Sequence, residues 1–142
     1  MRGRRRGLWT YILDFGSASL DRVNGHSVEA NGGHWNVGAT TDTWVRSELF
    51  LRDRTVRRSI KRFHVAGRAA TSYEIPSTLE SYFAGHFVVT WTLRNVRYFA
   101  SAHAFANRNR VLAMAAALIR LQRACGTRHQ TRGSCRSVLT MK

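Results

Sequence analysis

The second half of the chain contains no acidic residue. All eight acids lie at or before Glu80, whereas residues 81–142 hold ten of the 23 basic residues. The chain has 142 residues and a formal net charge of +15, and every cation except Lys61 and Lys142 is arginine. A surface without counter-charge weakens the compact state by self-repulsion unless a polyanion supplies the missing negative charge. We therefore expect a fold that faces a polyanion, and the planar guanidinium groups favour phosphate as that anion.

The composition is that of one folded domain. Hydrophobic residues make up 44% of the chain and aromatic residues 11%, which is enough apolar surface for a modest core. The length suits a single domain. We predict one RNA-binding domain over 1–142, with a basic arm at 1–7 and a basic tail at 126–142. No apolar run approaches the roughly 18 residues that a membrane-spanning helix needs, so we predict no membrane span.

The local patterns predict a small mixed α+β domain. Asn24-Gly25 between two short runs is typical of a two-residue hairpin turn, so we expect an N-terminal β-hairpin or hairpins. Residues 29–41, rich in Gly and Asn, predict a second turn or an irregular loop. Short strands are predicted at about 69–75 and 86–99, with a turn near Arg94-Asn95. The most regular helical pattern covers 104–123, and Gly126 is suited to end it.

Residues 43–66 have two open interpretations. As one basic amphipathic helix, the segment places its cations opposite a narrow apolar stripe, which consists of Val45, Leu49, Val56, Ile60 and Phe63. Asp42 or Thr43 is suited to cap this helix, and Gly67 to end it. As a hairpin, 44–52 and 59–65 would be paired strands. We favour the helix, with its arginines turned toward phosphates.

Clustered cations supply the candidate RNA contacts. The basic ends suit narrow grooves, and basic residues interleaved with aromatic ones suit unpaired bases. Among the aromatic residues Trp91, Tyr98, Phe99 and Phe105, we expect Trp91 and Phe105 to belong to the core. His64 is interpreted as a neutral phosphate or base contact. The predicted RNA-binding residues are Arg4, Arg5, Arg6, Arg54, Arg57, Arg58, Lys61, Arg62, Arg94, Arg97, Arg108, Arg110, Arg128, Arg132 and Arg136.

Catalytic motifs are not evident. The sequence has no Gly-rich nucleotide loop, zinc-protease motif or nucleophile elbow, and its acids are few and scattered. We predict no enzyme activity, no catalytic residue, no cofactor and no small-molecule substrate. Cys125, His129 and Cys135 form C-x3-H-x5-C, with His103 as a conceivable fourth zinc ligand. Zinc sites more often contain closely paired cysteines, so we favour two free thiols and predict no metal.

A small basic core with basic extensions at both ends resembles a ribosomal protein in composition and architecture. The segments "GRAATSYEIP", "HFVV" and "VRY" resemble, in that order, strands of the small-subunit ribosomal protein at the decoding centre, whereas "WVRSE" and "VRR" resemble a large-subunit protein. These are different families, so neither assigns a residue role. The resemblance implies an architectural subunit that contacts structured rRNA and neighbouring ribosomal proteins. The arginine-rich start fits a mitochondrial ribosome, and it fits a basic arm equally well.

The alternative is the coat protein of a small single-stranded RNA virus or phage. Early hairpins, the late strand "HFVVTWTL" and a following helix are similar to the small RNA-phage coat architecture, in which a sheet receives the RNA and the helix mediates dimerisation. Paired strands at 44–52 and 59–65 would favour this alternative. A third interpretation, a basic accessory subunit of a membrane complex, requires a large apolar patch that faces another protein.

Overall fold

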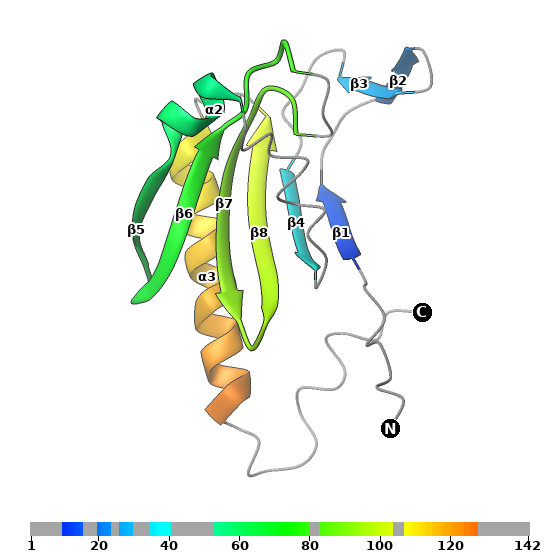
Figure 1. The fold of residues 1–142 in the computed structure, drawn as a ribbon. Coiled ribbons are helices and arrows are strands. Elements are labelled where there is room, and N and C mark those ends of the chain that lie inside the picture. The colour runs from blue at the N-terminus through cyan, green and yellow to red at the C-terminus, as the bar shows by residue number, and fades with distance from the viewer. Residues whose placement is uncertain are drawn as a thin grey trace, which may run out of the picture.

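The computed structural model of the chain combines strands and helices, which confirms the predicted α+β class. It describes residues 10–15, 20–23, 26–29, 35–40, 53–79, 83–103 and 107–127. Within these ranges, a six-stranded antiparallel sheet lies against a long C-terminal helix (Figure 1). The elements in chain order are β1 (Thr10–Phe15), β2 (Leu20–Val23), β3 (His26–Glu29), β4 (Trp35–Thr40), α2 (Arg54–Ser59), β5 (Lys61–Val65), β6 (Arg68–Glu74), β7 (His86–Leu93), β8 (Val96–His103) and α3 (Arg108–Thr127).

The main sheet has the strand order β1-β4-β8-β7-β6-β5, and all neighbouring strands are antiparallel. Strands β5 to β8 form a meander, whereas β4 lies between β1 and β8. Strands β2 and β3 form a separate hairpin in which Val23 opposes His26, which confirms the predicted hairpin. Arg94 and Asn95 form the predicted turn between β7 and β8, with φ angles of 50° and 65°, as a two-residue hairpin turn requires. The region predicted as strand at 86–99 is therefore two strands.

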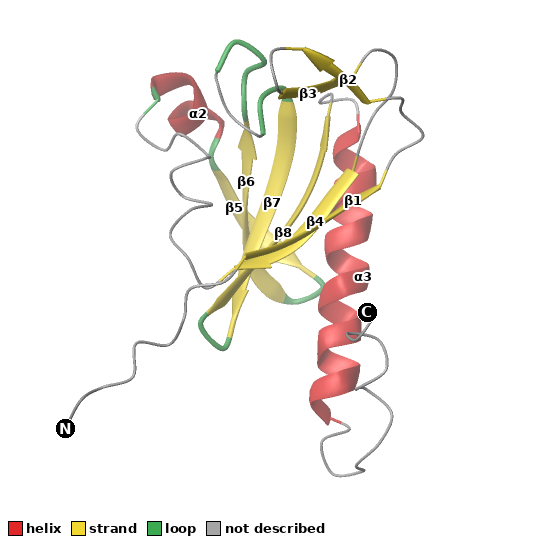
Figure 2. Cartoon of the chain, turned by 90° about the vertical axis from the view of Figure 1, so that its right-hand side faces the viewer, coloured by secondary structure: helices red, strands yellow, loops and turns green. Residues whose placement is uncertain are grey.

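Helix α3 covers one face of the sheet (Figure 2). Val111, Ala115 and Ile119, spaced four residues apart along one side of α3, are fully buried. The indole Nε1 of Trp91 donates to Oε1 of Gln122 at 3.0 Å and fixes the helix over β7. The helix predicted at 104–123 is confirmed, but it spans Arg108–Thr127 and continues past Gly126. The core on this helix face contains Val65, Ala70, Phe87, Val89, Trp91, Ala100, Ala102, Val111, Ala115 and Ile119.

Helix α2 lies on the opposite face of the sheet (Figure 2). Its Val56 is fully buried in a second, smaller core, which contains Val56, Tyr73, Ile75, Phe83, Val88 and Phe99. The carboxylate of Asp53 caps α2 by accepting from the backbone N–H groups of Thr55 and Val56. The Ser59 hydroxyl accepts from the Glu74 backbone N–H at 2.9 Å and joins the end of α2 to β6. These contacts hold α2 over one end of this second face.

The helix predicted over 43–66 is wrong from Ile60 onwards. Only Arg54–Ser59 are helical among the described residues of that range, and 61–65 form β5; residues 43–52 lie outside the described ranges. The expected apolar stripe is divided between the two faces, because Ile60 joins the core beneath α2 and Phe63 joins the core beneath α3. Alternation along a strand sends neighbours to opposite sides, and pairing with β6 satisfies the backbone of 61–65.

The turn or loop predicted at 29–41 is also wrong in part, because Trp35–Thr40 form β4. This strand contains Asn36 and Gly38, whose types are uncommon in strands. It is nevertheless paired on both sides, with β1 and with β8. Gly38 lies opposite Phe99, and Asn36 and Thr40 are fully buried. Hydrogen bonding of β4 to two distant strands therefore outweighs the preference of its Gly and Asn residues for turns.

Candidate nucleic-acid interface

The strand register assembles a polar surface on the sheet face opposite α3. In one row across the sheet, Arg62 opposes Thr71, and Thr71 opposes Thr90. Directly opposed residues point to the same side of a sheet, so these three side chains share the face. Thr92 and Arg97 are also opposed to each other, and Thr92 lies two residues beyond Thr90 on β7. A period of two along each strand therefore brings both arginines to one face.

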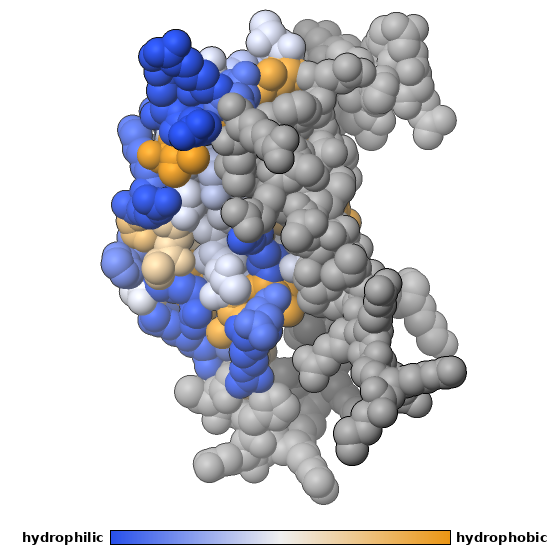
Figure 3. Space-filling view, viewed as in Figure 1, coloured by the Kyte–Doolittle hydropathy of each residue, from blue (hydrophilic) through white to orange (hydrophobic). Residues whose placement is uncertain are grey.

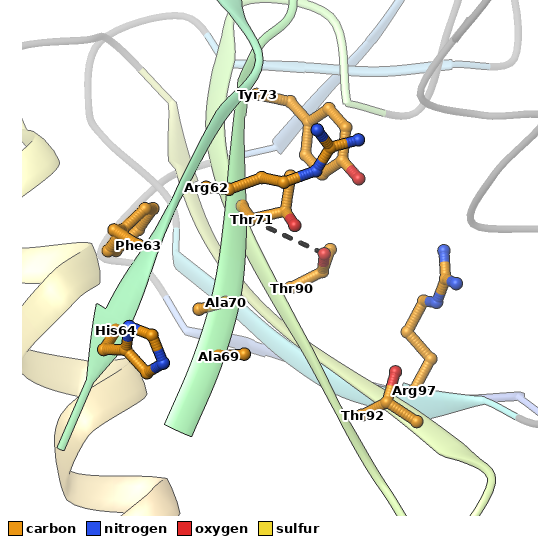
Figure 4. A pocket seen from close by; sticks show the side chains of 10 residues that line it. All are labelled: Arg62, Phe63, His64, Ala69, Ala70, Thr71, Tyr73, Thr90, Thr92 and Arg97. Carbon is orange, nitrogen blue, oxygen red and sulfur yellow. Dashed lines mark hydrogen bonds between the residues drawn. The ribbon is translucent and has the colours of Figure 1, made fainter. Parts of the chain in front are cut away.

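A hollow of about 310 Å³ lies on this face (Figure 4). Its lining residues are Arg62, Phe63, His64, Ala69, Ala70, Thr71, Tyr73, Thr90, Thr92 and Arg97. Small side chains occupy the two middle strands, with Ala69 and Thr71 on β6 and Thr90 and Thr92 on β7. The longer side chains of Arg62 on β5, Arg97 on β8 and Tyr73 on β6 surround them, so the hollow arises from short residues among long ones.

The two arginines stand on opposite sides of the hollow. Arg62 is on β5 and Arg97 on β8. The row that begins at Arg62 ends at Phe99 on β8, so three strand spacings and an offset of two residues put the two backbones about 16 Å apart. Arg62 is exposed and Arg97 is partly exposed. His64 lies two residues from Arg62 on the same side of β5, and its ring is also exposed. Two cations and an imidazole therefore border a floor of small residues.

No carboxylate neutralises these cations within residues 53–79 and 83–103. Those ranges contain two acids, Asp53 and Glu74. Asp53 caps α2, and Glu74 forms an ion pair with Arg108 on the helix face of the sheet. None of the ten lining residues is acidic. The hollow is consequently an electropositive surface, suited to an anionic ligand.

Helix α2 extends the basic surface beyond the hollow. Arg54, Arg57 and Arg58 are exposed, whereas Val56 on the other side of the same helix is fully buried. This part of the amphipathic prediction is confirmed, although the helix is much shorter than predicted. Figure 3 views this face of the molecule and shows hydrophilic residues over α2 and along β5, beside paler side chains nearer the middle of the sheet.

Other predicted contacts lie away from the hollow. Arg108 pairs with Glu74 and places its guanidinium carbon 5.7 Å from the Phe87 ring centre. Arg110 lies 5.5 Å from the ring centre of Trp35. Both arginines therefore contact the helix side of the sheet. Arg94 is at the exposed β7–β8 turn, and Lys61 is exposed on the edge strand β5. Six predicted residues lie outside the described ranges: Arg4, Arg5, Arg6, Arg128, Arg132 and Arg136.

The aromatic residues near the cations belong mainly to the cores. Trp91 is 2% exposed and Phe99 is fully buried, so the core assignment predicted for Trp91 is confirmed. Tyr98 is stacked on Trp91, with ring centres 5.9 Å apart. Phe105 lies outside the described residues. A ligand on this face would therefore stack on His64 or on the guanidinium planes of Arg62 and Arg97, and not on these aromatic rings.

Sequence reasoning missed the threonines of the floor. The signal was present in the alternation of β7, where Thr90 and Thr92 flank the buried Trp91. Thr90 Oγ1 donates to the Thr71 carbonyl oxygen at 3.5 Å. Hydroxyl groups both donate and accept hydrogen bonds. The floor can therefore meet the mixed donor and acceptor edges of a polar ligand.

The described residues contain no group of three His, Cys, Asp or Glu side chains that could hold a metal ion. Cys125 is partly exposed, while His129 and Cys135 lie outside the described ranges. In the part of the chain that the structure describes, no helix has the length and apolar character to cross a membrane.

Comparison of the chain with protein-family models, curated proteins and solved structures finds no match.

Proposed function

We propose that the protein is an RNA-binding architectural subunit of a ribonucleoprotein, and that the open sheet face with α2 carries the RNA. The observation that supports this most is the concave face bordered by Arg62 and Arg97, whose ten lining residues include no acid. Together with the exposed arginines of α2 it forms a basic surface on one side of the molecule. Arginines on such a surface neutralise phosphates and release their counterions.

The particle expected from composition is a ribosome. A strongly basic chain with arginine-rich ends is suited to fill gaps between rRNA helices and to contact neighbouring ribosomal proteins. A mitochondrial ribosome remains part of this proposal because of the arginine-rich start. Neither catalysis nor a small-molecule substrate is part of it.

A coat protein that packages single-stranded RNA is the second candidate, and one observation favours it. The six-stranded sheet has α3 on one face and leaves part of the other face open and basic. This matches the division expected of the RNA-phage coat, in which the sheet receives the RNA and the helix mediates dimerisation. Isolation of the protein from its source distinguishes the candidates, because a coat co-purifies with capsids and a ribosomal protein with ribosomal subunits.

Salt dependence of RNA affinity tests the shared proposal. The logarithm of the binding constant should fall linearly with the logarithm of salt concentration, by about 0.7–0.9 per phosphate neutralised. Replacing both Arg62 and Arg97 by Gln should reduce the slope by roughly 1.4–1.8 and weaken binding at low salt. Fluorescence anisotropy with a labelled RNA across a NaCl series measures both quantities.

The matched control is Arg120→Gln. Arg120 is exposed on α3, on the other side of the sheet, so its replacement lowers the net charge by one, as each single variant Arg62→Gln or Arg97→Gln does, without touching the proposed surface. A slope that changes as much in this control as it does for Arg62→Gln would mean that the net charge alone attracts RNA. An unchanged slope in the Arg62→Gln and Arg97→Gln double variant would exclude the hollow from the RNA-binding surface.

A further inference from the structure

We propose that the hollow on the open face binds one unpaired nucleotide of single-stranded RNA, with the base over the threonine floor and the flanking phosphates on Arg62 and Arg97. This inference rests on the RNA-binding function proposed above and specifies the class of RNA. Three properties of the site carry it: its concave shape, its hydroxyl groups and its planar cations.

The shape favours a nucleotide that leaves its helix. At about 310 Å³, the hollow lies at the small end of the range for ligand pockets. An A-form duplex presents a convex surface of phosphates and a shallow minor groove, and its bases cannot descend into a concavity. A base turned out of a loop or a single strand can. The floor is therefore accessible to an unpaired base and inaccessible to a paired one.

The floor supplies hydrogen-bonding groups. Among the described residues, the Thr71 and Thr92 hydroxyls have no protein partner, whereas Thr90 donates to the Thr71 carbonyl. A hydroxyl rotates to donate or accept. The hydroxyls of Thr71 and Thr92 can thus hydrogen-bond to the Watson–Crick edges of different bases. We therefore expect the hollow to have only a weak preference for RNA sequence.

The rim supplies planar groups and charge. The exposed imidazole of His64 and the guanidinium planes of Arg62 and Arg97 are groups on which unpaired bases stack. The two arginines stand on opposite sides of the floor, about 16 Å apart at their backbones, so a strand that crosses the hollow passes both. A strand that crosses the floor in this way places its flanking phosphates at the two arginines and the base between them over the threonines.

The test compares two RNAs with equal numbers of phosphates, an unstructured single strand and a hairpin whose stem is fully paired and whose loop is a non-nucleotide linker. In the double variant Thr71→Val and Thr92→Val, side-chain volume and strand preference are retained while both hydroxyls are removed. Affinity for the single strand should fall roughly tenfold, the order expected for two lost hydrogen bonds, and affinity for the hairpin should not change. Thr78→Val, at an exposed threonine outside the hollow, is the matched control.

A second variant tests the shape independently. Ala69 is exposed on the floor, and Ala69→Leu fills the hollow without altering any charge. Single-strand affinity should again fall while hairpin affinity stays constant. Equal effects on both RNAs, or no effect of either variant on the single strand, would overturn the unpaired-nucleotide site but leave RNA binding intact. Failure of the unmodified protein to bind either RNA in a salt-dependent manner would instead overturn the proposed function itself.

Discussion

Gly67 and Gly85 share one backbone conformation but have different neighbours. Both have a φ of +74°, a region that costs an L-residue roughly 1–2 kcal/mol. A Cβ at Gly67 would come within 3.0 Å of Nη2 of Arg123, the far end of a flexible side chain. At Gly85 it would come within 2.6 Å of Nε2 of His103. The ring of His103 lies edge-on to that of His86, with centres 5.4 Å apart, and has less freedom to move.

The two alanine variants should therefore differ in stability. Gly67→Ala should lower the free energy of unfolding by about 1–2 kcal/mol through backbone strain alone. Gly85→Ala should lower it by a further ~1–3 kcal/mol, because the added methyl group overpacks the site against His103. Urea unfolding followed by circular dichroism measures both losses. Equal losses would contradict the clash, and adding His103→Ala to Gly85→Ala should recover part of the difference.

Helix α3 presents one face to the sheet and the other to solvent. Ile119 is fully buried, whereas Leu121 is 48% exposed. Ile119→Ala should therefore lower the free energy of unfolding by about 2–5 kcal/mol, because it leaves a cavity between helix and sheet. Leu121→Ala should change it by less than about 0.5 kcal/mol. Thermal or urea unfolding of both variants checks the orientation of the helix, and a comparable loss for Leu121→Ala would show that its outer face is covered in solution.

Elements with strong local patterns were predictable from the sequence, and those that depend on distant partners were not. Helix α3 has apolar residues at helical spacing and β7 has the residue types of a half-buried strand, so both were identified. In 54–65, Val56, Ile60 and Phe63 also have helical spacing, but Phe63 packs beneath α3 and the other two beneath α2. Strand β4 owes its conformation to β1 and β8, which local preference does not reveal.

The candidate site shows the same division. Arg62, Arg97 and His64 were predicted to be RNA contacts from their residue types and surroundings. Their position around one hollow was not predictable, because Arg62 and Arg97 belong to different strands. They come to one face only through the register of β5 to β8. Thr71 and Thr92 acquire a role only once that register is known. Sequence patterns thus predict the kind of ligand, whereas the pairing of strands brings the candidate residues together.

At the scale of the whole molecule, the net charge of +15 links stability to the partner. Like charges raise the free energy of the compact state, and added salt screens them. A polyanion that binds only the folded chain stabilises it by mass action, but the same salt weakens that binding. Salt should therefore act in opposite directions on the free protein and on its RNA complex.

Melting curves across a NaCl series test this opposition. Without RNA, the melting temperature should rise with salt as repulsion is screened. With saturating single-stranded RNA, the melting temperature at low salt should be higher than that of the free protein. It should then fall toward the free-protein value as salt rises, because counterion release contributes less to binding at high salt. Arg62→Gln should reduce the difference in melting temperature between complex and free protein at low salt more than Arg120→Gln does, because both remove one charge but the control removes it from the opposite layer. A melting temperature of the free protein that falls with salt would show that ion pairs such as Arg108–Glu74 outweigh the repulsion. A difference in melting temperature between complex and free protein that does not depend on salt would rule out phosphate neutralisation as the source of binding.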